Sequence, residues 1–166
     1  MSARELEDIG LCRPEITHEI GKPFWRKIKR ETEMSTEFMS PATLPPPVGY
    51  SHVAKVNKGT LIYLAGQVSS DASGALVGEG NFEAQAERVY ANVKIAVEAA
   101  GATMADIVKL NTYIVAEVDP AEIPKMRAIR DRYVNVQKPP ASTLVVVSRL
   151  ARPGWLIEID AMAAID

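Results

Sequence analysis

The sequence predicts an α+β fold in which one β-sheet carries two helices on a single face. Five segments have the apolar pattern of strands, and two segments have the periodicity of amphipathic helices. Their order along the chain is β-β-α-β-α-β-β. Runs of strands joined by helical crossovers are typical of a two-layer sandwich.

The composition is that of an ordinary globular protein. The 166 residues are 47% hydrophobic and 24% charged, which suits one domain plus an appendage. A net charge of −2 argues against a large nucleic-acid-binding surface. No apolar run approaches the roughly 20 residues that span a bilayer, and the charged start resembles no signal peptide. Because Cys12 is the single cysteine, we expect a cytoplasmic protein without disulfides.

The N-terminal part differs from the rest of the chain. We expect residues 1–46 to be an extension with a proline-rich linker, and residues 47–166 to form the domain. The basic segment Lys22–Arg30 is interpreted as a solvated arm or short helix, with a nucleic-acid or membrane contact as the alternative. Prolines should keep Met39–Tyr50 extended. Met34 could also be an alternative start.

The first half of the domain is expected to begin with a β-hairpin. Its strands are Ser51–Val56 and Thr60–Val68, and Gly59 supplies the freedom of the turn. A loop of turn-forming residues follows. Asn81 then caps a long helix that Gly101 ends. The apolar residues of this helix follow helical spacing: Phe82, Ala86, Val89, Val93, Ala96, Val97 and Ala100.

The second half begins with a strand at Asp106–Ala116. A second helix follows, for which Asp119 is the cap, Pro120 suits the first turn and Glu122 can close a capping box. Pro139 and Pro140 end this region. Two further strands are expected at Ser142–Arg149 and Leu156–Ala164.

The strand patterns also predict self-association. Leu61–Ala65 and Leu144–Val147 are apolar on both alternating sets of positions, so both faces of the sheet need a cover. Two helices cover one face. We therefore expect a homo-oligomer whose sheets face inward.

The last predicted strand, unlike these two, is apolar on one face only. Ile157, Ile159 and Ala161 point one way, whereas Glu158 and Asp160 point the other. Two carboxylates on one strand face are costly to bury unless they are paired or hydrated. They indicate either a solvated rim or a polar pocket at a subunit interface.

Other site chemistries find little support in the sequence. His18, His52 and Cys12 have no metal-ligand spacing, so no metal is expected. Gly74–Gly80 lacks the lysine–serine ending of a phosphate-binding loop. His52 is interpreted as a hairpin side chain. Tyr50 either packs or lines a cleft.

Two arginines lie on the second predicted helix. Arg127 and Arg130 are expected to be solvated, although one of them could reach an interface pocket and hold an anion.

Four blocks of the chain resemble the Rid family of reactive intermediate deaminases, which are also labelled L-PSP endoribonucleases. They are "PVGYSHVAKVNKGTLIYLAGQV", "QAERVYANVKIAVEAAGATMADIVKLNTYIV", "PPASTLVVVSRL" and "LIEIDAMAAI". The resemblance implies a chorismate-mutase-like fold and a homotrimer with a small-molecule cleft between each pair of subunits. Active members hydrolyse enamines and imines to 2-keto acids and ammonia without a cofactor.

The resemblance also implies site residues. Tyr50 and Gly66 match residues that line the cleft, and Asp160 matches a carboxylate that positions the attacking water. Ser142 falls where active members carry an arginine that binds the substrate carboxylate. Arg127 is our candidate for replacing that charge.

Three functions follow as hypotheses. The leading one is a homotrimer that binds a small, anionic metabolite and acts as a deaminase-like hydrolase of a non-standard substrate. The second is a non-catalytic ligand-binding or chaperone-like protein. The third is an endoribonuclease, which the acidic net charge disfavours.

Overall fold

The computed structural model describes residues 35–166, and Met34–Asp166 forms one compact unit. Several sequence-based expectations lie outside the described residues: the arm at 1–33, its basic segment Lys22–Arg30, Cys12, His18 and the alternative start at Met34.

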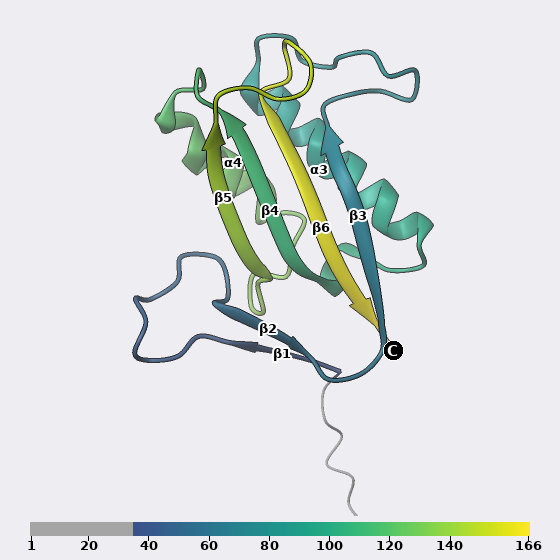
Figure 1. Cartoon of the computed structure of the whole chain (residues 1–166), viewed down its shortest axis with the longest axis vertical. Coiled ribbons are helices and arrows are strands. Elements are labelled where there is room, and N and C mark those ends of the chain that lie inside the picture. Colours follow the sequence, from purple (N-terminus) through teal and green to yellow (C-terminus); the bar gives the residue numbers. More distant parts are fainter. Residues whose placement is uncertain (1–34) are drawn as a thin grey trace, which may run out of the picture. The chain divides into compact units, whose positions relative to one another are not determined.

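The main sheet has four strands in the order β3-β6-β4-β5 (Figure 1). They are β3 (Thr60–Val68), β4 (Ile107–Val115), β5 (Ala141–Val147) and β6 (Ile157–Ile165). Strand β6 is antiparallel to both of its neighbours, whereas β4 and β5 are parallel. A parallel pair needs a crossover connection, and a helix supplies it here.

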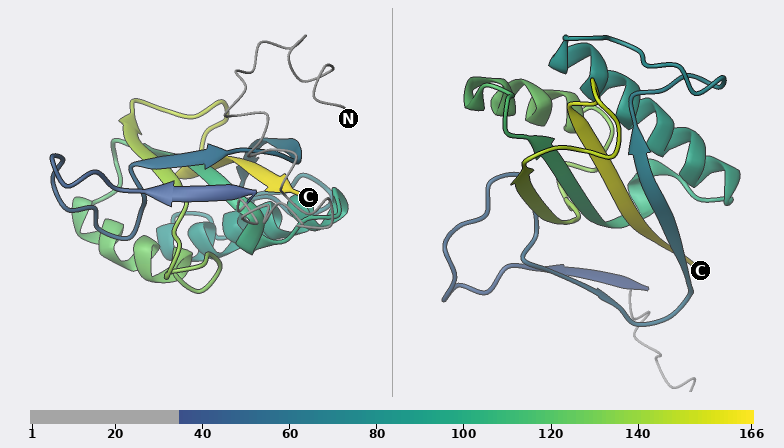
Figure 2. Two further views of the ribbon diagram at one scale, coloured as in Figure 1. Left: turned by 90° about the horizontal axis from the view of Figure 1, so that it is seen from below. Right: turned by 45° about the horizontal axis from the view of Figure 1, so that its top comes forward.

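Both helices cover the same face of this sheet (Figure 2). They are α3 (Phe82–Ala99) and α4 (Ile123–Arg130). The core lies between the two layers, so the predicted α+β sandwich is confirmed. Among its fully buried side chains are Tyr90, Ile107, Leu110, Ile114, Ile157 and Ile159.

Local signals set the ends of α3. The Asn81 side chain accepts a hydrogen bond from the amide of Ala84, as its capping role predicts. At the other end Gly101 adopts a φ of 81°, a left-handed conformation that favours glycine. Both predicted boundaries of this helix are confirmed.

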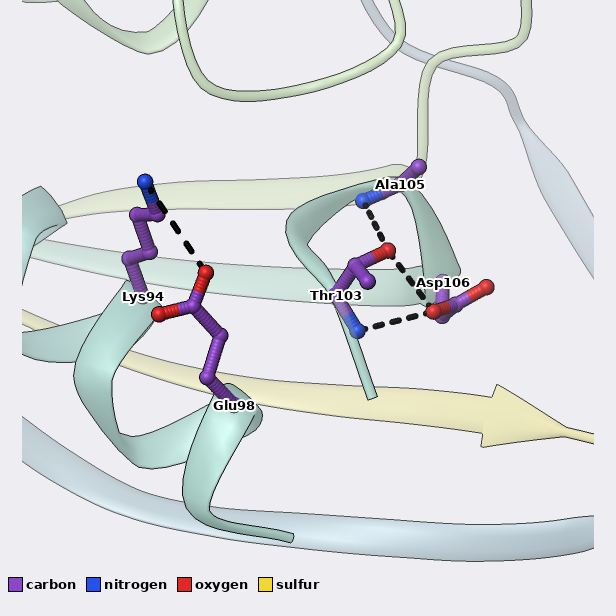
Figure 3. A network of polar contacts seen from close by, with 5 residues as sticks. All are labelled: Lys94, Glu98, Thr103, Ala105 and Asp106. Carbon is purple, nitrogen blue, oxygen red and sulfur yellow. Dashed lines mark hydrogen bonds and ion pairs between the residues drawn. The ribbon is translucent and has the colours of Figure 1, made fainter. Parts of the chain in front are cut away.

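The connection from α3 to β4 is fixed by polar contacts (Figure 3). Thr103 and Asp106 form a capping box around the short turn Met104–Asp106. Lys94 and Glu98 pair at 3.8 Å in the last turns of α3. The chain therefore enters β4 from a defined direction.

The start of α4 differs in detail from the expectation. The Asp119 side chain accepts from the amide of Ala121 and caps a 3₁₀ turn at Pro120–Glu122. Glu122 does not close a capping box, because its carboxylate binds the ammonium group of Lys125 at 2.6 Å.

The predicted β-hairpin is wrong in its pairing. Strand β2 (Val53–Val56) pairs antiparallel with β1 (Thr36–Met39), which the sequence did not identify as a strand. Gly59 does form the turn into β3, with a φ of 107°. The β1–β2 pair and the four-stranded sheet are separate sheets. With β1 as its partner, β2 has its ladder hydrogen bonds satisfied without β3.

The face of the main sheet opposite the helices, which we call the open face, is mixed in character. Leu61 and Tyr63 of β3 are apolar and 46% and 69% exposed. The alternation predicted for β6 is confirmed, because Ile157, Ile159 and Ala161 are buried and Glu158 and Asp160 lie on the open face. Figure 1 looks onto this face.

Candidate functional site

The start of β5 is tied to a distant segment through Ser51. Its hydroxyl donates to the carbonyl of Pro139 at 2.7 Å, and its amide donates to the carbonyl of Pro140 at 3.1 Å. A parallel bridge then pairs Ser51 with Ala141. We call these three contacts the Ser51 latch. It places Tyr50, the preceding residue, beside the first residues of β5.

A pocket of about 240 Å³ lies at this junction. It brings together three of the residues that the sequence analysis selected: Tyr50, Arg127 and Ser142. Its lining contains two guanidinium groups and no carboxylate, which suits an anion. The full lining is Val48, Tyr50, Tyr90, Thr112, Met126, Arg127, Arg130, Ser142 and Leu144.

Arg130 is the more enclosed of the two arginines, with 8% of its surface exposed. Its Nε and Nη2 both donate to Oδ1 of Asp131, at 2.9 and 2.7 Å. The guanidinium lies against Gly49, which has a φ of 70°, and a Cβ at that position would collide with it. The glycine before Tyr50 therefore makes room for Arg130.

Arg127 lies one turn earlier on α4 and is exposed. Within residues 35–166 its guanidinium makes no hydrogen bond or ion pair. It is therefore free to change conformation when a ligand enters the pocket.

His52 supports Tyr50 from outside the pocket. The two rings meet edge to face with 5.3 Å between their centroids. Nε2 of His52 lies 2.9 Å from the carbonyl oxygen of Pro45. His52 precedes β2 rather than lying in a hairpin, and it lines no part of the pocket.

Tyr90 and Thr112 form the floor of the pocket. Tyr90 is fully buried, and its hydroxyl donates to Sδ of Met126 at 3.6 Å. Burial raises the pKa of Tyr90 far above its ordinary value of 10.0, so the phenol stays neutral. The floor therefore offers a neutral hydroxyl and apolar surface.

Asp160 lies on the open face, away from this pocket. Asn111 donates to its Oδ1 at 2.8 Å, and the hydroxyl of Tyr113 donates to its Oδ2 at 3.1 Å. The hydrogen bond to Asp160 raises the pKa of Tyr113, and the negative charge of Asp160 adds to this shift. The strand register places Asn111 directly opposite Asp160.

Gly66 also lies with the open-face group. The pairing of β3 with β6 is irregular between Leu64 and Gln67, which brackets Gly66. The carboxylate of Glu158 occupies the place where a Cβ of residue 66 would lie. A larger residue at this position would displace Glu158.

One protomer thus holds the selected residues in two groups. Ser142 is paired with Leu110 and lines the helix-side pocket, whereas Asp160 is paired with Asn111 on the opposite face. Asn111 and Tyr113 were not identified from the sequence. The alternation of "KLNTYIV" places both on one strand face, but their position opposite Asp160 depends on a register that the sequence does not contain.

Among residues 35–166, no group of three histidine, cysteine, aspartate or glutamate side chains is arranged to hold a metal ion. No helix of the same region is long and apolar enough to cross a membrane.

A family model described as Endoribonuclease L-PSP matches residues 41–165. The chain belongs to this family, which is also called the Rid family. The match spans both groups of selected residues, from Tyr50 to Asp160.

Other Rid proteins are similar over most of the chain. A RutC family protein of Pyrococcus abyssi is 35% identical and covers 78% of this chain and 98% of its own. A solved Rid protein of Yersinia pestis is 37% identical, covers 80% of this chain and 100% of its own, and superposes with a TM-score of 0.73. A 2-iminobutanoate/2-iminopropanoate deaminase of Dermatophagoides farinae is 37% identical over 42% of this chain and 54% of its own.

Proposed function

We propose that this Rid protein binds a small carboxylate-bearing metabolite, an enamine or imine acid, in clefts between the subunits of a homotrimer. The observation that carries the proposal is the pocket in which Tyr50, Ser142 and two arginines converge without an acidic neighbour in the lining. The deaminase named among the relatives is consistent with this ligand class.

The proposal includes a departure from active members, because position 142 is serine where they carry arginine. Hydrogen bonds to charged groups contribute roughly 1.5–3 kcal/mol, and a serine hydroxyl offers one neutral donor. A tenfold change in affinity or rate corresponds to about 1.4 kcal/mol. We therefore expect an affinity or rate roughly ten to a hundred times lower than in members that carry the arginine, unless another cation compensates. Arg127 and Arg130 line the same pocket, so either can supply that charge.

The proposed reaction is hydrolysis of the carbon–nitrogen double bond. Water adds to the imine carbon, the nitrogen leaves as ammonia, and a 2-keto acid remains. Asp160 would orient the water. Because Asp160 lies on the open face, it would act on a ligand held in the pocket of a neighbouring subunit.

The test is the decay of 2-aminoacrylate generated in vitro. We expect weak acceleration by the wild-type protein and a gain of about tenfold or more for Ser142→Arg, since the substitution restores a charge-assisted contact. Ser73→Arg is the matched control, because it adds the same charge in an exposed loop that does not line the pocket. Wild-type activity equal to that of an arginine-bearing member would contradict the proposal, as would equal gains in the two variants.

A non-catalytic ligand-binding role is the second candidate. It is favoured by the two hydrogen bonds that occupy both oxygens of Asp160. Tight binding of 2-keto acids without any imine decay, in the wild type and in Ser142→Arg alike, would support it. RNA cleavage that persists through stringent purification would instead support an endoribonuclease.

A further inference from the structure

Within residues 35–166, one nitrogen of the Arg130 guanidinium makes no hydrogen bond. Nε and Nη2 bind Asp131, and within residues 35–166 Nη1 has no acceptor. The same residues contain no buried side-chain nitrogen or oxygen that lacks a hydrogen-bond partner. Nη1 is therefore accessible to solvent, and Arg130 is one of the residues that line the pocket.

Arg130 is also held in place before any ligand arrives. Asp131 fixes two of its nitrogens, and the missing side chain of Gly49 makes room for the guanidinium. A fixed donor loses little conformational entropy on binding, whereas the exposed Arg127 must be ordered first.

We propose that Arg130, rather than Arg127, is the main anion-binding residue of the pocket, and that Asp131 is a built-in counter-charge that weakens this binding. The inference rests on the proposed function, because it names the residue that recognises the carboxylate in that pocket. Two arginines and one adjacent aspartate leave a local charge of about +1, which suits a monocarboxylate such as a 2-keto acid.

The test is calorimetric titration of the full-length protein with 2-oxobutanoate, a stable ligand that requires no turnover. We expect Arg130→Gln to weaken binding by about tenfold or more, because a charge-assisted contact is lost. Arg127→Gln, the matched variant on the same helix, should weaken it by only a few-fold. Arg130→Lys should have an affinity between those of the wild type and Arg130→Gln, since one ammonium group cannot bind Asp131 and the ligand equally well.

The decisive variant is Asp131→Asn. Asparagine keeps an amide oxygen that can accept from Nε and Nη2 and hold the guanidinium in place, but it removes the negative charge beside Arg130. The protein should therefore become less stable, and 2-oxobutanoate should bind several-fold more tightly. A purely structural role for Arg130 predicts no such gain. Asp131 has a half-exposed side chain, so this variant should fold even if Arg130→Gln does not.

The inference fails if folded Asp131→Asn binds no more tightly than the wild type, if Arg127→Gln costs more affinity than Arg130→Gln, or if the wild type does not bind 2-oxobutanoate. It is separable from the proposed hydrolysis. A protein that binds in the expected order but leaves 2-aminoacrylate intact would contradict the hydrolysis alone. A protein that hydrolyses the imine with the reverse order would contradict Arg130 alone.

Discussion

At the scale of single residues, Asp160 is held at both carboxylate oxygens by side chains of the neighbouring strand. Asn111 and Tyr113 of β4 donate these hydrogen bonds. They fix the orientation of the carboxylate. A carboxylate held in this way can orient a water molecule.

The pair of Tyr113 and Asp160 makes a pH-dependent prediction. The folded-state pKa of Tyr113 is raised above 10.0, so the unfolded chain releases the phenol proton at a lower pH than the folded chain. The stabilisation from this hydrogen bond is therefore complete below pH 10 and is lost as the pH rises through the folded-state pKa. Tyr113→Phe should lose less stability than the wild type on passing above pH 10.

Urea unfolding on both sides of pH 10 measures this difference. Tyr63→Phe is the control, because Tyr63 is an exposed tyrosine on the same face. If the stability of Tyr113→Phe falls as steeply as that of the wild type, the hydrogen bond to Asp160 does not persist in solution.

Some residues of the pocket could be predicted from the sequence, and others could not. The resemblance to the Rid family was enough to select Tyr50 and Ser142, and the structure places both in one pocket. The sequence led to Arg127 and not to Arg130 as the candidate cation. The difference between these arginines depends on Gly49, which is 81 positions earlier in the chain and reaches Arg130 only in the folded protein.

At the scale of elements, the Ser51 latch determines the shape of the pocket. Pro139 and Pro140 have no amide hydrogen, so the carbonyl oxygen of each is its backbone group that can form a hydrogen bond with Ser51. Both accept from it. The latch thus fixes the distance between the segment that carries Tyr50 and the strand that carries Ser142.

Removal of the Ser51 hydroxyl should affect both stability and binding. Ser51→Ala loses one intramolecular hydrogen bond, which costs about 1 kcal/mol of unfolding free energy. Because Tyr50 is then held less firmly, we also expect weaker binding of 2-oxobutanoate. Chemical denaturation and calorimetry measure the two effects.

Ser73→Ala is the control for this variant. It removes a serine hydroxyl that donates to Asp71 at 2.6 Å, in a loop that does not line the pocket. It should leave ligand binding unchanged. Equal effects of the two substitutions on affinity would mean that the latch does not shape the pocket.

The elements themselves differ in how well the sequence predicted them. Helix α3 was predicted at both ends, because Asn81 and Gly101 act within one turn of it. The pairing of β2 was predicted wrongly. The turn at Gly59 is a local signal, but the choice between β1 and β3 as the partner of β2 depends on contacts that local patterns do not specify.

At the scale of the whole molecule, we expect another subunit to cover the open face. Tyr63 and Leu61 expose apolar surface beside the carboxylates Glu158 and Asp160. A second copy of the chain would cover the apolar part and bring its own helix-side pocket toward Asp160 of the first. The two groups of site residues, separate within one protomer, would then meet between protomers.

This arrangement predicts a trimer in solution that depends on the open face. Light scattering should give three times the protomer mass for the wild-type protein and a smaller mass for Tyr63→Glu, because the substitution places a charge in an apolar interface. Ile95→Glu is the control, since Ile95 of α3 is exposed but lies outside the sheet. A monomeric wild type, or an intact trimer of Tyr63→Glu, would contradict the assignment of this face.

The Ser51 latch has a consequence for ligand exchange. Residues 40–49, which precede it, are mostly exposed and bury little apolar surface. Their local opening therefore costs far less free energy than the opening of β4 or β6, whose side chains form the core. We therefore expect the segment that carries Tyr50 to open while the sheet and both helices stay folded. Ligand exchange would then be limited by a few hydrogen bonds at Ser51 and not by the global stability of the protein.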